Sequence, residues 1–117
     1  MFTEFHSYPN FTQNRYFRAY VNIIQQCINT PPNTRYTEKH HILPDCFGGT
    51  TMVVVDYRTH YILHKLLTKF TIGKDKAKMC WALHVFFHFN YARERNPDFI
   101  PYTTTNSLRY AQHKKIL

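Results

Sequence analysis

Apolar residues recur at helical spacing along three segments of the chain and in short extended runs between the first two. The first helical segment spans about residues 12–28, where apolar side chains three and four residues apart share one face. Pro31 and Pro32 then end the helix. Residues 1–11 hold Pro9 and scattered aromatics, and they predict an irregular arm. The apolar stripe of the helix consists of Phe17, Tyr20, Val21, Ile24, Cys27 and Ile28.

Short extended runs and turn residues fill the middle of the chain. Residues 35–42 predict a first strand, turn residues break the chain at Pro44 and Gly48-Gly49, and the β-branched run 53–55 predicts a second strand. Two strands joined by a loop with paired glycines indicate an antiparallel hairpin. Asp56 directly follows and is a good N-cap. The helix it begins should span about residues 57–70 and bury Leu63, Leu66, Leu67 and Phe70.

Two further helices are expected after Gly73. One spans about residues 74–91, and a short last helix spans about residues 106–115, beyond a linker marked by Pro97 and Pro101. The chain has 117 residues, which is enough for one small domain. The sequence therefore predicts a single α+β domain over residues 1–117. It should be mainly helical, with a β-β-α unit at about residues 36–70 flanked by helices on both sides. The first of these two helices should direct Met79, Cys80, Leu83, Phe86 and Phe87 inward.

The net charge of the chain indicates which kind of molecule it binds. The formal net charge is +8 and the isoelectric point is near 9.6, which indicates a polyanionic partner. Nucleic acid is the first choice, and an acidic membrane surface, an acidic protein or no such partner are the alternatives. No run approaches the roughly 20 apolar residues of a membrane span, and no signal peptide is visible, so we expect a cytoplasmic protein with no membrane partner.

Three cysteines, Cys27, Cys46 and Cys80, lie far apart. The absence of a C-x-x-C pair disfavours a zinc ribbon or a redox dithiol. We expect these cysteines to be reduced and at least partly buried.

Four histidines within 25 residues carry the candidate chemistry. His40 and His41 are adjacent on the predicted strand, so they point to opposite faces, whereas His60 and His64 are four apart and share one face of the predicted helix. One strand histidine can therefore join His60 and His64 around a metal and leave positions open for water and substrate. The other remains beside it as a base with a near-neutral pKa. Chance pairing of surface or core histidines is an equally good interpretation of the spacing alone.

The order of these residues resembles the HNH endonuclease family, and most closely its small free-standing bacteriophage members. The resemblance covers about residues 36–70, roughly a third of the chain. It rests on E-K-H-H-I-L-P at residues 38–44, on Gly48-Gly49, and on R-T-H-Y-I-L-H-K-L-L at residues 58–67. What it implies is a ββα-metal fold and one-metal hydrolysis of DNA, as in homing endonucleases, leaving a 5′-phosphate and a 3′-hydroxyl.

By position, the resemblance implies a role for each histidine. His40 matches the first metal ligand, His41 the general base that activates water, and His60 the second ligand. His64 matches a third ligand or a contact to the scissile phosphate. The cofactor would be one divalent ion, Mg, Mn, Zn or Ni; three imidazoles favour the transition metals, whereas Mg prefers oxygen ligands.

Departures from the family pattern keep two alternatives open. The family's middle Asn has no match, and its position falls on Thr51; Thr59 and Asp45 also differ from the usual residues. One alternative is therefore an HNH-derived module that binds DNA or protein with weak or no cleavage. The other is a structural zinc site closed by Cys46.

The expected substrate is double-stranded DNA, inside the host bacterial cytoplasm if a phage encodes the protein. The oligomeric state stays open: a monomer would nick one strand, and a homodimer could cut both. A second H-x-x-x-H pair, His84 and His88, is interpreted as incidental. Basic residues beside the histidine helix and after Gly73 are the candidate DNA contacts: Arg58, Lys65, Lys74, Lys76 and Lys78.

Overall fold

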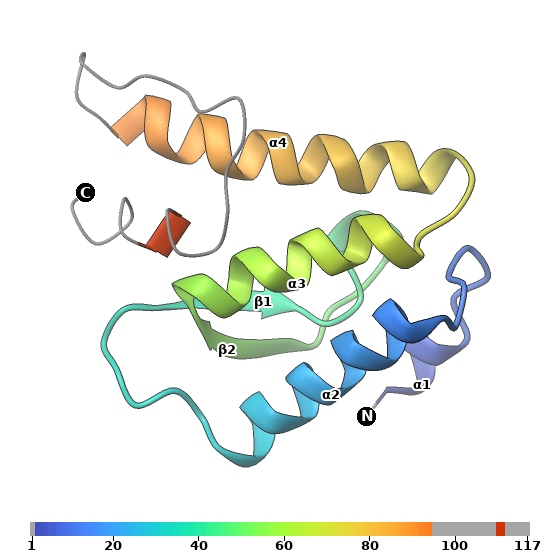
Figure 1. The fold of residues 1–117 in the computed structure, drawn as a ribbon, viewed down its shortest axis with the longest axis horizontal. Helices are drawn as coiled ribbons and strands as arrows, with labels where there is room; N and C mark the ends of the chain where they lie inside the picture. The colour runs from blue at the N-terminus through green and yellow to red at the C-terminus, as the bar shows by residue number, and fades with distance from the viewer. Residues whose placement is uncertain (1, 95–109, 112–117) are drawn as a thin grey trace.

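A computed structural model describes residues 2–94 and 110–111 of the chain. A two-stranded antiparallel hairpin runs directly into a helix, and further helices flank this unit on both sides (Figure 1). The predicted fold class, α+β and mainly helical with a ββα core, is confirmed. In chain order the elements are α1 (Thr3–His6), α2 (Arg15–Asn29), β1 (Thr37–His41), the 3-10 turn η1 (Asp45–Phe47), β2 (Met52–Asp56), α3 (Tyr57–Phe70) and α4 (Lys74–Glu94).

The hairpin has a register that sets which strand residues face the core. Thr37 pairs with Asp56 at one end, and His41 pairs with Met52 at the other. Alternation along β2 buries Val53 and Val55 and leaves Met52 and Val54 exposed. His40 lies opposite Val53 and is buried with it. The register therefore turns His40, rather than His41, toward the interior.

Glycine is required at both positions of the loop between the strands. Gly48 has φ of 92°, a left-handed conformation, where it ends η1. Gly49 approaches the backbone so closely that a Cβ there would lie 1.8 Å from the carbonyl oxygen of Leu43. Its N–H donates to the carbonyl of Pro44 at 3.2 Å. The tight loop returns the chain to β2 directly beside the end of β1.

Two side-chain caps define where the helices begin. Asp56 accepts a hydrogen bond from the backbone N–H of Thr59 at 2.7 Å, so α3 begins at the predicted residue. Asn14 accepts from the N–H groups of Tyr16 and Phe17, each at 3.0 Å. The first long helix therefore begins at Arg15, three residues later than the hydrophobic pattern predicted.

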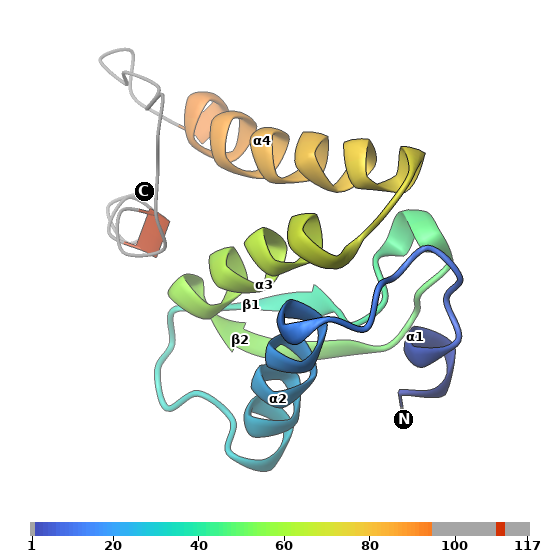
Figure 2. The same ribbon diagram turned by 45° about the vertical axis from the view of Figure 1, so that its right-hand side comes forward.

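The helix α3 lies at the centre of the fold, between α2 and the hairpin on one side and α4 on the other (Figures 1 and 2). An aromatic cluster fills the space between α2, α3 and the N-terminal arm. Phe5 lies at its centre, with ring centroids 5.1 Å from both Phe17 and Tyr20. The buried members of this cluster are Phe5, Phe11, Phe17, Tyr20 and Phe70.

The N-terminal arm packs into the core, and only residues 3–6 depart from the irregular structure predicted for it. It forms the turn of helix α1, and Phe11 makes an antiparallel bridge with Thr71. Tyr8 and Asn10 donate hydrogen bonds to the carboxylate of Asp75 at the start of α4. Hydrogen bonds to residues more than sixty positions away hold the arm in place. The sequence pattern within residues 1–11 gives no indication of these partners.

Two predicted cysteine environments were also wrong. Cys46 and Cys80 are exposed, and only Cys27 is half-buried; all three are free thiols. On α4 the predicted inward residue Met79 is buried, whereas Cys80 is turned about 100° away from it and faces outward. The side chains of the predicted inward residues Phe86 and Phe87 lie outside the described part of the chain.

Only Tyr110 and Ala111 of the expected last helix are among the described residues. Tyr110 is fully buried and stacks on Tyr61 of α3, with ring centroids 6.0 Å apart. Within residues 2–94 and 110–111, no helix is long and apolar enough to cross a membrane.

Candidate metal centre

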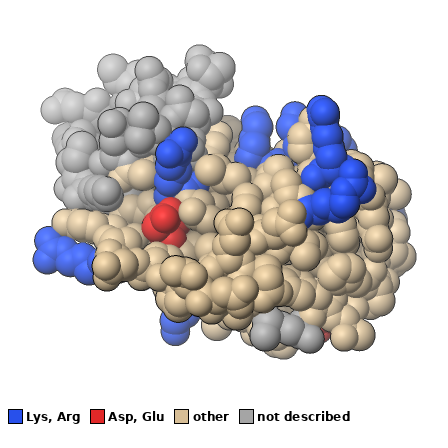
Figure 3. Space-filling model, turned by 60° about the horizontal axis from the view of Figure 1, so that its bottom comes forward, with Lys and Arg blue, Asp and Glu red and all other residues tan. Residues whose placement is uncertain are grey.

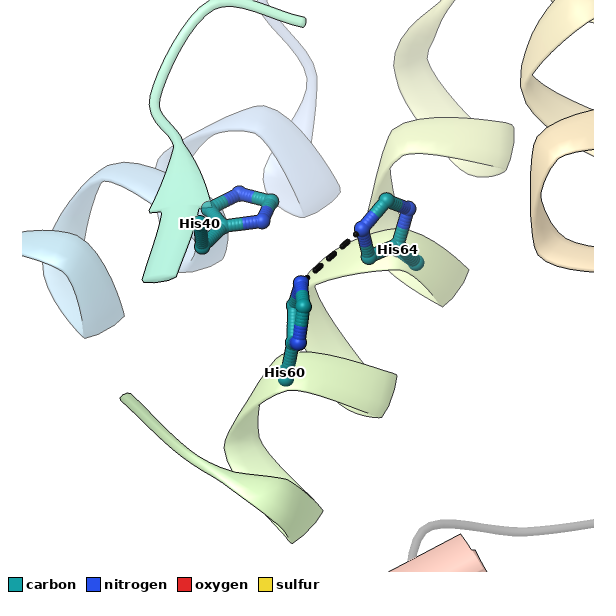
Figure 4. Close-up of side chains that lie close together, drawn as sticks. All are labelled: His40, His60 and His64. Atoms are coloured by element: carbon teal, nitrogen blue, oxygen red, sulfur yellow. Dashed lines mark hydrogen bonds between the residues drawn. The ribbon is translucent and has the colours of Figure 1, made fainter. Parts of the chain in front are cut away.

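His40, His60 and His64 converge in the space between β1 and α3 (Figure 4). His40 is directed there by the inward face of the strand, and the helix places His60 and His64 one turn apart on the face that meets it. One potential ligand atom from each of the three lies within 4.8 Å of the others. The three ring centroids are 4.9–5.2 Å apart.

The spacing of two ring nitrogens matches that of ligands sharing one ion. The Nε2 atoms of His60 and His64 are 3.2 Å apart. Two nitrogens bound at 2.0–2.1 Å to a tetrahedral ion are about 3.3–3.4 Å apart. His40 and His60 are also buried and His64 is half-buried, so little water competes for these nitrogens. The three residues therefore fit a divalent transition metal.

Glu38 orients His60 toward this point. It lies two residues before His40, on the same face of β1, and its Oε1 is 3.1 Å from Nδ1 of His60. The hydroxyl of Tyr110 donates to the same carboxylate oxygen at 2.7 Å. When the Nδ1–H of His60 donates to Glu38, the lone pair of Nε2 faces His64. A carboxylate behind a histidine is the usual support of a metal ligand.

Burial keeps the imidazoles of His40 and His64 neutral. Desolvation is the largest cause that lowers the pKa of His64 from 6.5 to about 3, with the neighbouring His60 adding to it and Glu38 opposing it. Desolvation, followed by the nearby histidines, also lowers the pKa of His40 well below its usual value. Neutral imidazoles are the form that binds metals, so proton competition at His40 and His64 is weak near neutral pH.

A cavity of about 290 Å³ opens beside the three histidines. Residues from β1, η1, α3 and α4 line it, including His41, Asp45 and Cys46. Cys46 shares the cavity but does not belong to the group whose ligand atoms lie within 4.8 Å of one another. The described residues thus form a three-histidine site with an open side, not the closed site with Cys46 that was one alternative.

His41 and Thr51 lie at the same end of the hairpin, and of these two residues only His41 lines the cavity. His41 is half-buried and lines the cavity. Thr51 is exposed, and its backbone carbonyl accepts a hydrogen bond from the N–H of Ile42 at 3.0 Å. The backbone at Thr51 therefore extends the strand pairing one residue beyond His41, while its side chain supplies no amide to the site.

The predicted DNA contacts fall into two groups. Lys74, Lys76 and Lys78 are exposed at the start of α4, where Lys78 pairs with Asp75 at 3.6 Å. Arg58 and Lys65 are exposed on α3, about 160° and 140° around the helix from His60, and do not line the cavity. Lys and Arg side chains are spread over several parts of the face shown in Figure 3, whereas Asp and Glu side chains occupy little of this face.

Three supporting residues and one cavity residue were missed from the sequence. Tyr20 binds Nε2 of His40, and Tyr110 binds Glu38; both are distant in sequence and carry no local signal. Glu38 could have been found, since strand alternation places it on the face of His40. Lys39 lines the cavity next to the histidines.

Of the second histidine pair, His84 does not belong to the converging group, and among the described residues it joins no other such group. The ring of His84 is exposed and stacks on Trp81 at 5.4 Å. The side chain of His88 lies outside the described part of the chain.

Comparison with known proteins finds two relatives, both from Enterobacteria phage T4. The chain is 33% identical over 82 residues to "Probable mobile endonuclease D", which covers 63% of this chain and 31% of that protein. It is 34% identical over 58 residues to "Probable mobile endonuclease E", which covers 46% of this chain and 41% of that protein. The chain thus spans only 31% and 41% of the length of these two relatives. No family model matches the chain, and no solved structure matches it significantly.

Proposed function

We propose that this protein is a metal-dependent endonuclease of the HNH type, encoded by a phage, that hydrolyses phosphodiester bonds in double-stranded DNA. Residues 1–117 would form one endonuclease domain. The observation that carries the proposal is the convergence of His40, His60 and His64 at an open cavity that His41 also lines. Partial similarity to two phage proteins named as probable mobile endonucleases supports the same activity.

Each histidine has a role in this proposal. His40, His60 and His64 hold one divalent ion, which would act as a Lewis acid toward a phosphate oxygen and the departing oxygen. His41 takes the proton from the attacking water, because it lines the same cavity and is not one of the three converging residues. Glu38 holds the ring of His60 in orientation through the 3.1 Å contact to Nδ1.

Basic side chains around the cavity would hold the DNA backbone. Lys39 lines the cavity, and Lys78 is close enough to the cavity residue Cys46 to influence its thiol. Lys74 and Lys76 extend this basic surface along the start of α4, and DNA that continues past α3 would meet Arg58 and Lys65. The net charge of +8 supplies the sequence-independent attraction.

The environment of Thr51 favours a second candidate function. Its exposed, short side chain gives His41 no amide partner, and only its backbone braces the end of β1. A base held less firmly would activate water poorly. In that case the protein would be a DNA-binding module with weak cleavage.

A plasmid assay distinguishes the two functions. Supercoiled plasmid is incubated with purified protein and Mn²⁺ or Mg²⁺, beside His41→Ala and the control His84→Ala, whose histidine is exposed and does not line the cavity. The nuclease proposal expects nicking by the wild type and the control and none by His41→Ala. Binding without nicking in the wild type would refute the nuclease and leave the binding module.

A further inference from the structure

The side chain of Tyr20 on α2 contacts the two residues that flank His41 in the chain. It is fully buried, and its hydroxyl donates a hydrogen bond to the carbonyl oxygen of Ile42 at 2.6 Å. The same hydroxyl oxygen lies 2.7 Å from Nε2 of His40. One side chain thus contacts the residue before the proposed base and the residue after it.

The hydroxyl of Tyr20 has a single proton, and the carbonyl of Ile42 determines the direction in which this proton is donated. A carbonyl oxygen can only accept, so the short bond to Ile42 requires the proton of Tyr20 to point there. The remaining contact, between the hydroxyl oxygen and His40, then needs a proton supplied by Nε2. A neutral imidazole protonated on Nε2 has its lone pair on Nδ1.

We propose that Tyr20 is a positioning residue that fixes His40 as the Nε2–H tautomer, so that Nδ1 is the atom it offers to a metal. This inference rests on the proposed metal site and extends it to a residue outside the β-β-α unit. A ligand histidine that donates its other ring N–H to a fixed acceptor is held in one tautomer and one orientation. His60 is held in the same way by Glu38, through the opposite ring nitrogen.

The bond to Ile42 gives Tyr20 a second effect. Ile42 donates its N–H to the carbonyl of Thr51 and accepts from Tyr20 through its own carbonyl, so its peptide groups are fixed from both sides. Because His41 precedes Ile42 directly, this arrangement holds the backbone that carries the proposed base. Tyr20 therefore couples the orientation of His40 to the position of His41.

The test combines the tautomer of His40 with zinc affinity. Long-range ¹H–¹⁵N correlation spectra of the metal-free protein at neutral pH report which ring nitrogen carries the proton. Zn²⁺ affinity is measured by competition with a chromophoric chelator for the wild type, Tyr20→Phe and the control Tyr16→Phe. Tyr16 lies on the same helix, and its hydroxyl bonds only the exposed Arg15 among the described contacts.

We expect Nε2–H at His40 in the wild type and in Tyr16→Phe. Loss of the hydroxyl in Tyr20→Phe should weaken Zn²⁺ binding about 10- to 100-fold and remove the single-tautomer signal. An Nδ1–H tautomer in the wild type would overturn the proposal even if Tyr20→Phe does not fold. So would a folded Tyr20→Phe protein with wild-type affinity and tautomer.

Failure of the nuclease proposal gives a different result. Absence of plasmid nicking, with the expected tautomer and affinity change, would refute the enzyme and support the role of Tyr20. Nicking with the opposite tautomer would support the enzyme and refute the role of Tyr20.

Discussion

Glu38→Gln removes the charge behind His60 while keeping a side chain of the same length. Glu38 accepts from Nδ1 of His60 at 3.1 Å and from Tyr110 at 2.7 Å, and the side chains of Glu38 and His60 are only 20% and 7% exposed. A charge this shielded is screened less than a surface pair. Supporting residues of this kind contribute about 10- to 100-fold in metal affinity, or about 1.4–2.8 kcal/mol.

The two substitutions at Glu38 should differ in size. The amide oxygen of Gln can still accept from Nδ1 of His60, so we expect the lower end of that range, about tenfold, for Glu38→Gln. Glu38→Ala removes the acceptor as well and should approach about 100-fold. Because the orientation of His60 is the cause, the metal-free protein should keep its fold in both variants.

Calorimetric titration with Zn²⁺ measures these affinities, and Asp45→Asn is the matched control. Asp45 also lines the cavity and carries the same charge, but it is exposed and lies on η1 rather than on β1. Its substitution should leave the affinity near that of the wild type. Wild-type affinity in Glu38→Gln, or an equal loss in Asp45→Asn, would refute the argument that Glu38 acts by orienting His60.

Three further predictions concern pH, packing and DNA. The pKa of His64 is lowered to about 3, so the stability that this residue contributes is present above pH 6.5 and is lost as the pH falls toward 3. Urea unfolding in the presence of a chelator should therefore give a free energy of unfolding about 3 kcal/mol lower at pH 4 than at pH 7 because of this residue. The loss between the two pH values should be smaller in His64→Ala. An equal loss in that variant would contradict the assignment. Phe5→Ala should lower the free energy of unfolding in urea by about 3–5 kcal/mol, because Phe5 is only 1% exposed within the aromatic cluster. A decrease below about 1 kcal/mol would mean that the N-terminal arm does not stabilise the core. Lys78→Ala should lower the slope of log affinity for duplex DNA against log salt by about 0.9. The control Arg18→Ala, an exposed residue on α2, which lies across α3 from α4, should not change this slope. An unchanged slope in Lys78→Ala would exclude a phosphate contact at Lys78.

The hairpin and α3 could be predicted because their signals are local. A cap at Asp56, a β-branched run and paired glycines each act within a few residues, and α3 begins and ends where these signals place it. The same alternation and helical periodicity predict that one strand histidine meets His60 and His64. The register of the hairpin then decides that it is His40.

The rest of the fold depends on contacts between distant residues. Phe5 is buried because α2 and α3 together form a site for its ring, and no spacing within residues 1–11 shows this. Tyr20 has the pattern of an ordinary core residue on α2, although its hydroxyl is bonded to His40 and Ile42. The periodicity of a sequence indicates which face of a helix or strand a residue occupies. It does not indicate which polar atom of another element that residue will bind.

A crystal structure of the zinc-loaded protein, with anomalous diffraction measured at the zinc edge, would test directly whether three histidines form an open metal site. We expect a single strong peak between β1 and α3, about 2.0–2.1 Å from one nitrogen each of His40, His60 and His64. Neither His41 nor Cys46 should contact the ion. A peak bound by Cys46, or the absence of a peak among these three histidines, would show that the protein does not hold an open three-histidine metal site.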